Sequence, residues 1–213
     1  MNILILGAAG QIARLLTDSL LQQTDHHLVL YARNAGQRLK VSQTDRLKVI
    51  TGDFTDEDAL KAAMKNIDLV YVNAMGDVEA ASSIVAAMDH AGVKRVIVAS
   101  ILGIYDEVPG AFGSWNKRMV GNARIKQQAK SVGIIEIPRL NYTILRLTWL
   151  YNENNHKGYI VTEKGNPFEG AQVTRQAVCQ LIMDIIEDTT GKFNKTSLGV
   201  SEPNTNWDKP SFY

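Results

Sequence analysis

The chain of 213 residues contains a single cysteine, Cys179, and only four histidines. One cysteine cannot build a disulfide framework or a cysteine metal site within one chain. Cys179 stands in an apolar pattern, so we expect it to pack in the core. His26, His27, His90 and His156 include no pair with the spacing of metal ligands on one helix, and we therefore expect no metal site.

Charge of one sign and long apolar runs are also lacking. The 23 basic and 22 acidic side chains leave a net charge of +1, which gives no field that would collect nucleic acid or anionic membranes. No apolar run approaches the roughly 18 residues that span a bilayer, and no basic and apolar leader precedes the first predicted strand. We expect a cytoplasmic protein whose partner is a small-molecule substrate, with no nucleic-acid or membrane partner.

The most informative feature that is present is a glycine turn near the start of the chain. Residues 1–6 (MNILIL) form a short apolar strand that leads into the segment GAAGQIA, after which a helical apolar pattern begins. Gly7 permits a backbone torsion that a β-carbon would penalise, and Gly10 removes the side chain where a pyrophosphate approaches the helix. The N–H groups of the helix and its dipole then face the phosphates. A strand-to-helix turn that binds nothing is the alternative interpretation.

Strands and helices alternate along the rest of the chain. We expect strands over residues 27–31, 46–50, 67–73, 94–99, 142–147, 159–161 and 196–200, and helices over residues 11–23, 56–65, 77–91, 116–137 and 174–187. Thr55 is the expected N-cap of the second helix. This alternation predicts an α/β fold with a Rossmann-like, doubly wound and mainly parallel sheet. A length of 213 residues fits one such domain, with substrate-side loops in residues 100–116 and 147–170.

Ligands of such sheets bind beyond the carboxyl ends of the strands, so the residues at these ends matter most. After the second strand, Arg33 stands where a cofactor without a 2′-phosphate would meet an acid, so the sequence favours NADP(H), with NAD(H) as the alternative. A solvated surface arginine is the competing interpretation. After the third strand, Asp53 either accepts from the adenine amine or caps the next helix, and Phe54 supplies apolar contact. Residues 74–76 let the backbone approach the cofactor.

Taken in order, these motifs resemble the atypical short-chain dehydrogenase/reductases, in their NmrA-like, NAD(P)-binding branch. The resemblance rests on G-x-x-G-x-x-A, Arg33, the GDF turn, the segment NAMG, the segment VAS and the strand NYTILR, and it covers nearly the whole chain. It implies a Rossmann fold with the cofactor across the strand ends. The residues to which it gives cofactor roles are Gly7, Gly10, Gln11, Ile12, Arg33, Asp53, Phe54, Ala74, Met75 and Gly76.

The catalytic part of the family pattern is incomplete in this chain. Classical members use Y-x-x-x-K as proton donor, together with a serine, and this chain has no Y-x-x-x-K. Ser100 matches the family serine. Tyr105 is close enough in sequence to be a substitute acid, and equally it could be a wall of the substrate pocket. Lys126 and Lys130 are explained more simply as a solvated helix face than as the family lysine.

These observations support two functions. The first is an oxidoreductase that exchanges a hydride between NADP(H) and a small carbonyl or quinone-like compound, since the cofactor supplies much of the chemistry. The second is a non-catalytic redox sensor that binds the dinucleotide and a protein partner, which the missing Y-x-x-x-K favours. An isomerase or epimerase would need an acid/base pair that the sequence lacks. Ser-His-Asp hydrolysis is not supported either, because there is no G-x-S-x-G elbow.

Overall fold

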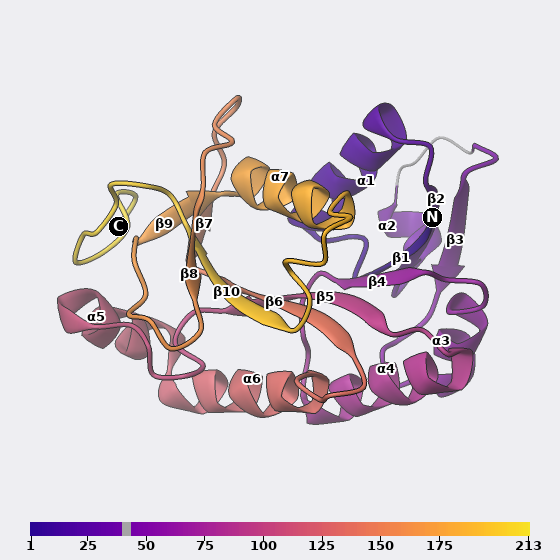
Figure 1. Cartoon of the computed structure of the whole chain (residues 1–213), viewed down its shortest axis with the longest axis horizontal. Helices are drawn as coiled ribbons and strands as arrows, with labels where there is room; N and C mark the ends of the chain where they lie inside the picture. Colours follow the sequence, from indigo (N-terminus) through magenta and orange to yellow (C-terminus); the bar gives the residue numbers. More distant parts are fainter. Residues whose placement is uncertain (40–43) are drawn as a thin grey trace.

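Eight strands form one sheet, with helices packed on both faces (Figure 1). In the computed structural model, which describes residues 1–39 and 44–213, the strand order is β3-β2-β1-β4-β5-β6-β10-β8. The neighbouring strands of this sheet are parallel, except that β8 runs antiparallel to β10. The predicted doubly wound, Rossmann-like fold is therefore confirmed. The chain order reverses direction across the sheet between β1 and β4, and ligands of such folds bind at this point.

The strands are β1 (Asn2–Leu6), β2 (His27–Ala32), β3 (Leu47–Thr51), β4 (Leu69–Val72), β5 (Arg95–Ile101), β6 (Asn141–Leu147), β7 (Trp149–Tyr151), β8 (Ile160–Glu163), β9 (Gln172–Thr174) and β10 (Thr196–Ser201). The helices are α1 (Gln11–Gln23), α2 (Ala35–Arg38), α3 (Glu57–Ala63), α4 (Val78–Ala91), α5 (Gly110–Val120), α6 (Asn122–Ile135) and α7 (Arg175–Ile186). The strands β7 and β9 were not expected from the sequence, and they pair with each other as a separate small sheet.

Alternate residues of the central strands face two hydrophobic clusters. In β1, Ile3 and Ile5 belong to the cluster under α1 and α7, whereas Leu4 and Leu6 belong to the cluster under α3, α4 and α6. Figure 1 shows α1 and α7 side by side on one face of the sheet and α3, α4 and α6 on the other. Burial on both faces explains why these strands read as continuous apolar runs.

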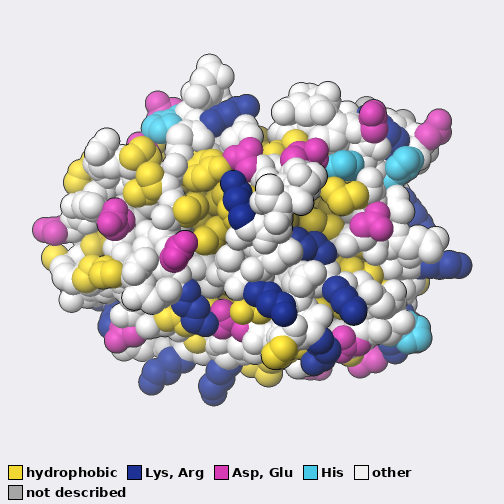
Figure 2. Space-filling view, viewed as in Figure 1, with side chains coloured by type: hydrophobic (Ala, Val, Ile, Leu, Met, Phe, Trp, Pro, Cys, Tyr) yellow, Lys and Arg dark blue, Asp and Glu magenta, His cyan; other side chains and the backbone are white. Residues whose placement is uncertain are grey.

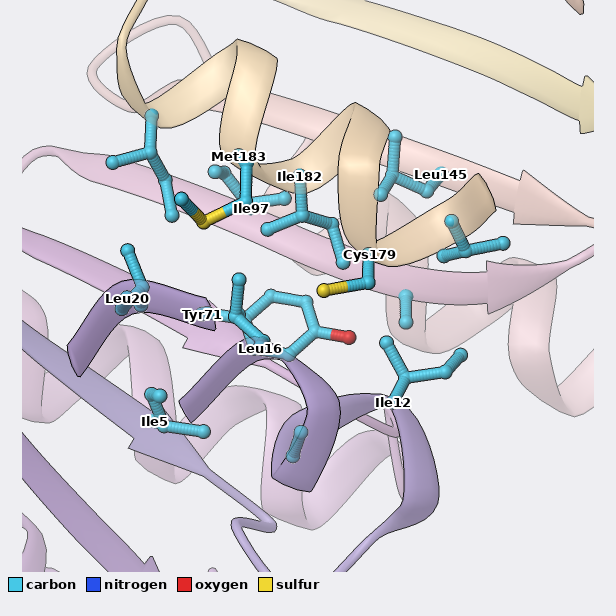
Figure 3. Packing of buried hydrophobic residues seen from close by; sticks show 14 of the residues in the cluster. Ile5, Ile12, Leu16, Leu20, Tyr71, Ile97, Leu145, Cys179, Ile182 and Met183 are labelled. Atoms are coloured by element: carbon cyan, nitrogen blue, oxygen red, sulfur yellow. The ribbon is translucent and has the colours of Figure 1, made fainter. Parts of the chain in front are cut away.

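The buried tyrosine of β4 lies in the first of these clusters. The ring of Tyr71 packs between α1 and α7 with Leu16, Cys179 and Ile182 around it (Figure 3). Its hydroxyl donates a hydrogen bond to Asn73 Oδ1 at 3.2 Å, and burial raises the pKa of this phenol. Cys179 is buried and free, as its apolar surroundings in the sequence predicted.

Two local predictions were wrong. The expected helix over residues 116–137 is two helices, because Gly121 has φ 88° and separates α5 from α6. Thr55 is not the N-cap of α3. Asp56 is the cap, and its side chain accepts a hydrogen bond from the Ala59 N–H at 3.0 Å.

Basic and acidic side chains are interspersed on the face shown in Figure 2, which matches the near-zero net charge. None of the helices in the described ranges is long and apolar enough to cross a membrane. Within residues 1–39 and 44–213, no three side chains of His, Cys, Asp or Glu come together as a metal site.

Candidate functional site

The glycine turn connects β1 to α1 at the point where the strand order reverses. Gly7 has φ +76°, a conformation that favours glycine, and the N–H groups of Gly7 and Ala8 both donate to Tyr31 O, at 3.0 and 3.1 Å. The Gly10 N–H donates to Gly7 O at 3.0 Å and closes the turn. The main chain is thus fixed against the end of β2 before α1 begins.

Glycine at residue 10 is required by Asn73, the residue that directly follows β4. A β-carbon at residue 10 would overlap the side-chain amide of Asn73, and that amide is held by the hydroxyl of Tyr71. The close approach brings the ends of β1 and β4 together below the first turn of α1. The backbone torsions at Gly10 are ordinary, so the close contact, and not the backbone conformation, requires glycine here.

The first turn of α1 is suited to bind an anion. Gly10 provides no side-chain cap, and the first turn contains no acidic residue. The first N–H groups of a helix have no partner within it, and they combine with the helix dipole to favour a phosphate. The exposed Gln11 and the buried Ile12 begin this turn, where the sequence placed the pyrophosphate. These residues fit the diphosphate of a dinucleotide.

One cavity, of about 400 Å³, lies on the β2 and β3 side of the turn, and we call it the Arg33 cavity. The residues that line it include six of the predicted cofactor residues, Gly7, Arg33, Asp53, Phe54, Ala74 and Gly76. The Arg33 side chain is 74% exposed, and its Nε lies 3.7 Å from Asp53 Oδ2. Arg38, which the sequence analysis missed, also lines this cavity. Two guanidinium groups therefore border the space beyond β2.

Asp53 is held in a tight turn of its own. Its Oδ1 accepts hydrogen bonds from the Thr55 N–H at 3.2 Å and from the Thr55 hydroxyl at 3.1 Å. The backbone hydrogen bond from Thr55, together with smaller effects that include Arg33, lowers the pKa of Asp53. The alternative in which Asp53 caps α3 is wrong, since Asp56 does so. Asp53 Oδ2, on the Arg33 side, remains available to a ligand.

A second cavity, of about 320 Å³, lies at the ends of β4, β5 and β6, and we call it the Ser100 cavity. Five predicted residues, Gln11, Ile12, Ala74, Met75 and Ser100, line it. Ser100 is 4% exposed, and its Oγ makes no hydrogen bond to any described residue. A buried hydroxyl without a partner is costly, so this group is available to a ligand in the cavity.

The segment between the two cavities is fixed from α6. The side-chain amide of Gln128 donates to Met75 O at 2.9 Å and to Gly76 O at 3.2 Å. Because Ala74 lines both cavities, a ligand that spans them would cross this segment and the start of α1. Gln128 was not predicted from the sequence, where its only signal is its place on the helix after the fifth strand.

Tyr105 lies outside the set of residues that line the Ser100 cavity. Its hydroxyl donates to Glu136 Oε1 at 2.6 Å and accepts from the Ser197 hydroxyl at 3.2 Å, and burial raises the pKa of Tyr105. The Glu107 carboxylate accepts a hydrogen bond from the Tyr105 N–H at 2.9 Å and fixes the turn that carries Tyr105. Tyr105 is not among the residues that line the Ser100 cavity. The structure therefore does not bring Tyr105 and Ser100 into one site, either as proton donor or as pocket wall.

Two arginines that the sequence analysis missed do line the Ser100 cavity. Arg124 comes from α6 and Arg175 from the first turn of α7. They are distant in sequence from the glycine turn and from each other, and no motif marks them. Only the folded arrangement of α6 and α7 at the end of the sheet brings them to the cavity.

A family described as NAD(P)H-binding matches residues 7–189 of the chain. A short-chain dehydrogenase/reductase from Veillonella parvula, crystallised with NADP, is 39% identical, with 99% of each chain covered and a TM-score of 0.96. A Rossmann-fold NAD(P)-binding family protein from Shigella flexneri is 34% identical over 100% of this chain and 98% of its own, with a TM-score of 0.82.

More distant structures share the fold. An anaerobillin reductase from Escherichia coli O157:H7 is 20% identical, covers 99% of this chain and 100% of its own, and has a TM-score of 0.77. No curated protein matches the chain. The two relatives from Veillonella parvula and Shigella flexneri are alike to this chain along nearly its entire length, and their descriptions name NADP and NAD(P) binding.

Proposed function

Because this chain belongs to the NAD(P)H-binding family, we propose that it is an NADP(H)-dependent oxidoreductase that reduces a small carbonyl or quinone-like compound. The proposal draws on the relation to the short-chain dehydrogenase/reductases and on the two cavities that meet at the glycine turn. The NmrA-like branch and a cytoplasmic location remain predictions from the sequence.

Arg33 and Arg38 support the choice of NADP(H). Both line the cavity beyond β2, where the 2′-phosphate of an adenosine ribose lies in folds of this kind. An arginine fork binds a phosphate well, whereas the unphosphorylated cofactor is ordinarily met by an acid. The relative from Veillonella parvula was crystallised with NADP. Asp53 lies beside Arg33 and offsets part of its charge, and Arg38 is the second cation at this cavity.

The observation that carries the oxidoreductase proposal is the unpartnered Ser100 hydroxyl on the wall of the Ser100 cavity. When bound, the reduced nicotinamide supplies a hydride. The Ser100 hydroxyl donates a hydrogen bond to the carbonyl oxygen of the acceptor and orients it. Each reduction also consumes one proton. No tyrosine is found among the described residues that line this cavity, so we assign the proton to solvent.

The test is turnover of NADPH with a panel of carbonyl and quinone acceptors. Wild-type protein should oxidise NADPH with at least one acceptor, and Ser100→Ala should lower kcat about tenfold or more with an unchanged cofactor Kd. Ser82→Ala is the matched control, because Ser82 lies on the exposed side of α4. Tight cofactor binding without turnover across the whole panel would reject the proposal.

The second candidate is a redox sensor that binds the cofactor without turning it over. The observation that favours it is the position of Tyr105, whose hydroxyl is bound to Glu136 and not directed to the Ser100 cavity. A sensor should bind NADP⁺ and NADPH with different affinities, or bind a protein partner in one cofactor state only. Calorimetric titration with both cofactor forms and pull-downs in each cofactor state test the sensor, and equal affinities together with no partner would reject it.

A further inference from the structure

A third cavity, of about 420 Å³, adjoins the Ser100 cavity, and we call it the aromatic cavity. The two cavities share six lining residues, Ile101, Arg124, Leu147, Thr148, Leu150 and Arg175. The residues that line only the aromatic cavity include Met119, Trp149, Phe212 and Tyr213. A molecule held at Ser100 can therefore extend past the two arginines to an aromatic wall.

The rings of the aromatic wall pack on one another. The rings of Trp149 and Tyr213 meet edge to face with centroids 5.0 Å apart, and Trp115 packs on both at 4.8 and 5.2 Å. Trp149 Nε1 donates to Asn116 Oδ1 at 3.0 Å. Phe212 and Tyr213 follow Ser211, whose N–H donates a hydrogen bond to Gln172 Oε1 at 2.9 Å and holds this end of the chain in place. Fixed aromatic rings suit a flat ring system.

The charged side chains that line the two cavities are positive. Arg124 and Arg175 line both cavities, and none of the aspartates or glutamates that the structure describes lines either of them. Arg124 has no ion pair or side-chain hydrogen bond within the described part of the chain, and Arg175 has a neutral partner there, Asn152 Oδ1 at 3.2 Å. Arg175 is half-buried, and this burial lowers the pKa of its guanidinium, whereas Arg124 is exposed. A partly desolvated cation without a counterion favours an anion.

We propose that the acceptor substrate is an aromatic compound with an anionic substituent such as a carboxylate or sulfonate. Its rings contact the wall of Trp149 and Tyr213, its anionic group pairs with Arg124 and Arg175, and its reducible carbonyl reaches Ser100. The inference rests on the proposed reductase function and names the substrate class of the same site.

The cofactor is the competing anion. Asn152 holds Arg175 and also approaches Gln11, with its Nδ2 3.5 Å from Gln11 Oε1 at the start of α1. Arg175 is thus near the predicted pyrophosphate position, and it could serve the cofactor in place of the substrate. If Arg175 binds the cofactor, its removal lowers the affinity for NADPH. If it binds the substrate, its removal lowers the preference for anionic acceptors.

The experiment compares a naphthoquinone sulfonate with its unsulfonated parent naphthoquinone in wild type, Arg124→Gln and Arg175→Gln. The ratio of the two KM values cancels general effects on the pocket. Wild type should bind the sulfonate better, and each variant should reduce that preference about tenfold, as the loss of a charged hydrogen bond implies. The NADPH Kd should change less than twofold. Lys126→Gln, which removes an exposed charge from α6 outside both cavities, should leave both values unchanged.

An unchanged preference in both variants would overturn the inference, and so would a loss of NADPH affinity as large as the loss of preference. Failure of the reductase proposal is recognised separately, as no turnover with the two quinones or with any other acceptor of the panel. In that case, quenching of tryptophan fluorescence in the NADP⁺-loaded protein gives the Kd of each quinone. The sulfonate should bind more tightly, with the preference lost in Arg124→Gln and Arg175→Gln. Equal binding of the two quinones by wild type would overturn the inference.

Discussion

The side-chain amide of Asn73 lies where a β-carbon on residue 10 would have to be. Gly10→Ala should therefore force Asn73 away from its hydrogen bond with Tyr71 and shift the first turn of α1. Overpacking of this kind costs about 1–3 kcal/mol, and the cofactor Kd should rise about tenfold or more because the phosphate-binding turn moves. Urea denaturation and calorimetric titration with NADP⁺ measure the two effects.

A second variant separates the collision from other effects of the alanine. Asn73→Ala removes the amide that the β-carbon would meet and leaves Gly7 O as the nearest remaining atom, so adding Gly10→Ala to that background should cost less than it does in wild type. Equal costs in the two backgrounds would contradict the assignment of the collision to Asn73, because contacting residues are expected to be non-additive.

Arg33→Ala should weaken binding of NADP(H) far more than binding of NAD(H). Removing a charged hydrogen bond to a phosphate costs about 1.5–3 kcal/mol, which corresponds to at least about tenfold in Kd. NAD(H) lacks the 2′-phosphate that this guanidinium would bind, so the Kd of NAD(H) should hardly change. Arg118→Ala, an exposed arginine outside the Arg33 cavity, is the control. Equal effects on the two cofactors would show that Arg33 is a solvated surface residue.

The sequence predicted the sheet and the glycine turn because both depend on local pattern. Strands buried on both faces are apolar runs, and Gly7 and Gly10 stand between the first run and the first helical pattern. The break at Gly121 was missed since glycine inside a helical pattern is tolerated. Thr55 and Asp56 are both capping residue types, so composition alone could not decide between them.

The cofactor side of the site was predictable to a larger extent than the substrate side. Residues at the ends of parallel strands converge in any fold of this class, which is why Arg33, Asp53 and Ser100 were found. Arg124 and Arg175 are brought to their cavities by the packing of α6 and α7, and no short sequence pattern records that. Tyr105 is turned toward Glu136 by hydrogen bonds from its own turn to Glu107, a tertiary detail that spacing does not show.

The lowered pKa of Asp53 makes a prediction about acid stability. The folded protein holds this carboxylate ionised at a pH where the unfolded chain already binds the proton, so its contribution to stability is present above the unfolded pKa of about 4. That contribution is lost as the pH falls through the lower folded pKa. The free energy of unfolding should therefore fall less steeply with acidification in Asp53→Asn than in wild type.

Asp208→Asn provides the control for this comparison. The Asp208 carboxylate is exposed, with no hydrogen bond or ion pair in the described part of the chain, so its removal should leave the acid limb of the stability curve as in wild type. Urea denaturation at several pH values below neutrality tests both variants. A wild-type slope in Asp53→Asn would mean that the turn with Thr55 and Arg33 does not favour the charged form.

Tyr105→Phe should affect stability and not catalysis. The variant loses the hydrogen bond that the hydroxyl donates to Glu136 and the one that it accepts from Ser197, at a cost of about 1 kcal/mol. Glu136 keeps its ion pair with Lys164 at 2.9 Å, so the loss should stay small. The kcat and the cofactor Kd should match wild type in steady-state assays and titrations. A large fall in kcat without a change in stability would show that Tyr105 reaches the substrate after all.

Arg146 and Glu107 form a buried ion pair, with side chains 0% and 5% exposed and Nη1 2.8 Å from Oε1. Arg146 Nη2 also donates to Thr162 O at 2.8 Å and to Ser197 O at 3.2 Å, so it ties β6 to β8 and β10. Glu107 accepts the Gly103 N–H at 3.0 Å, which ties the turn after β5 to the same point. The pair joins the edge of the sheet to the turn that follows Ser100.

Arg146→Met should cost about 3–5 kcal/mol of unfolding free energy, because it leaves the Glu107 carboxylate buried without a counterion. The free energy of unfolding of a domain is about 5–15 kcal/mol, and this cost is a large share of it. The single variant is therefore expected to be hard to purify. The double variant Glu107→Gln with Arg146→Met removes both charges, and it should be more stable than the single variant in urea denaturation. The double variant could also prove no more stable than Arg146→Met. The cost would then come from the lost packing of the arginine and its hydrogen bonds to β8 and β10, and not from the unpaired Glu107 carboxylate.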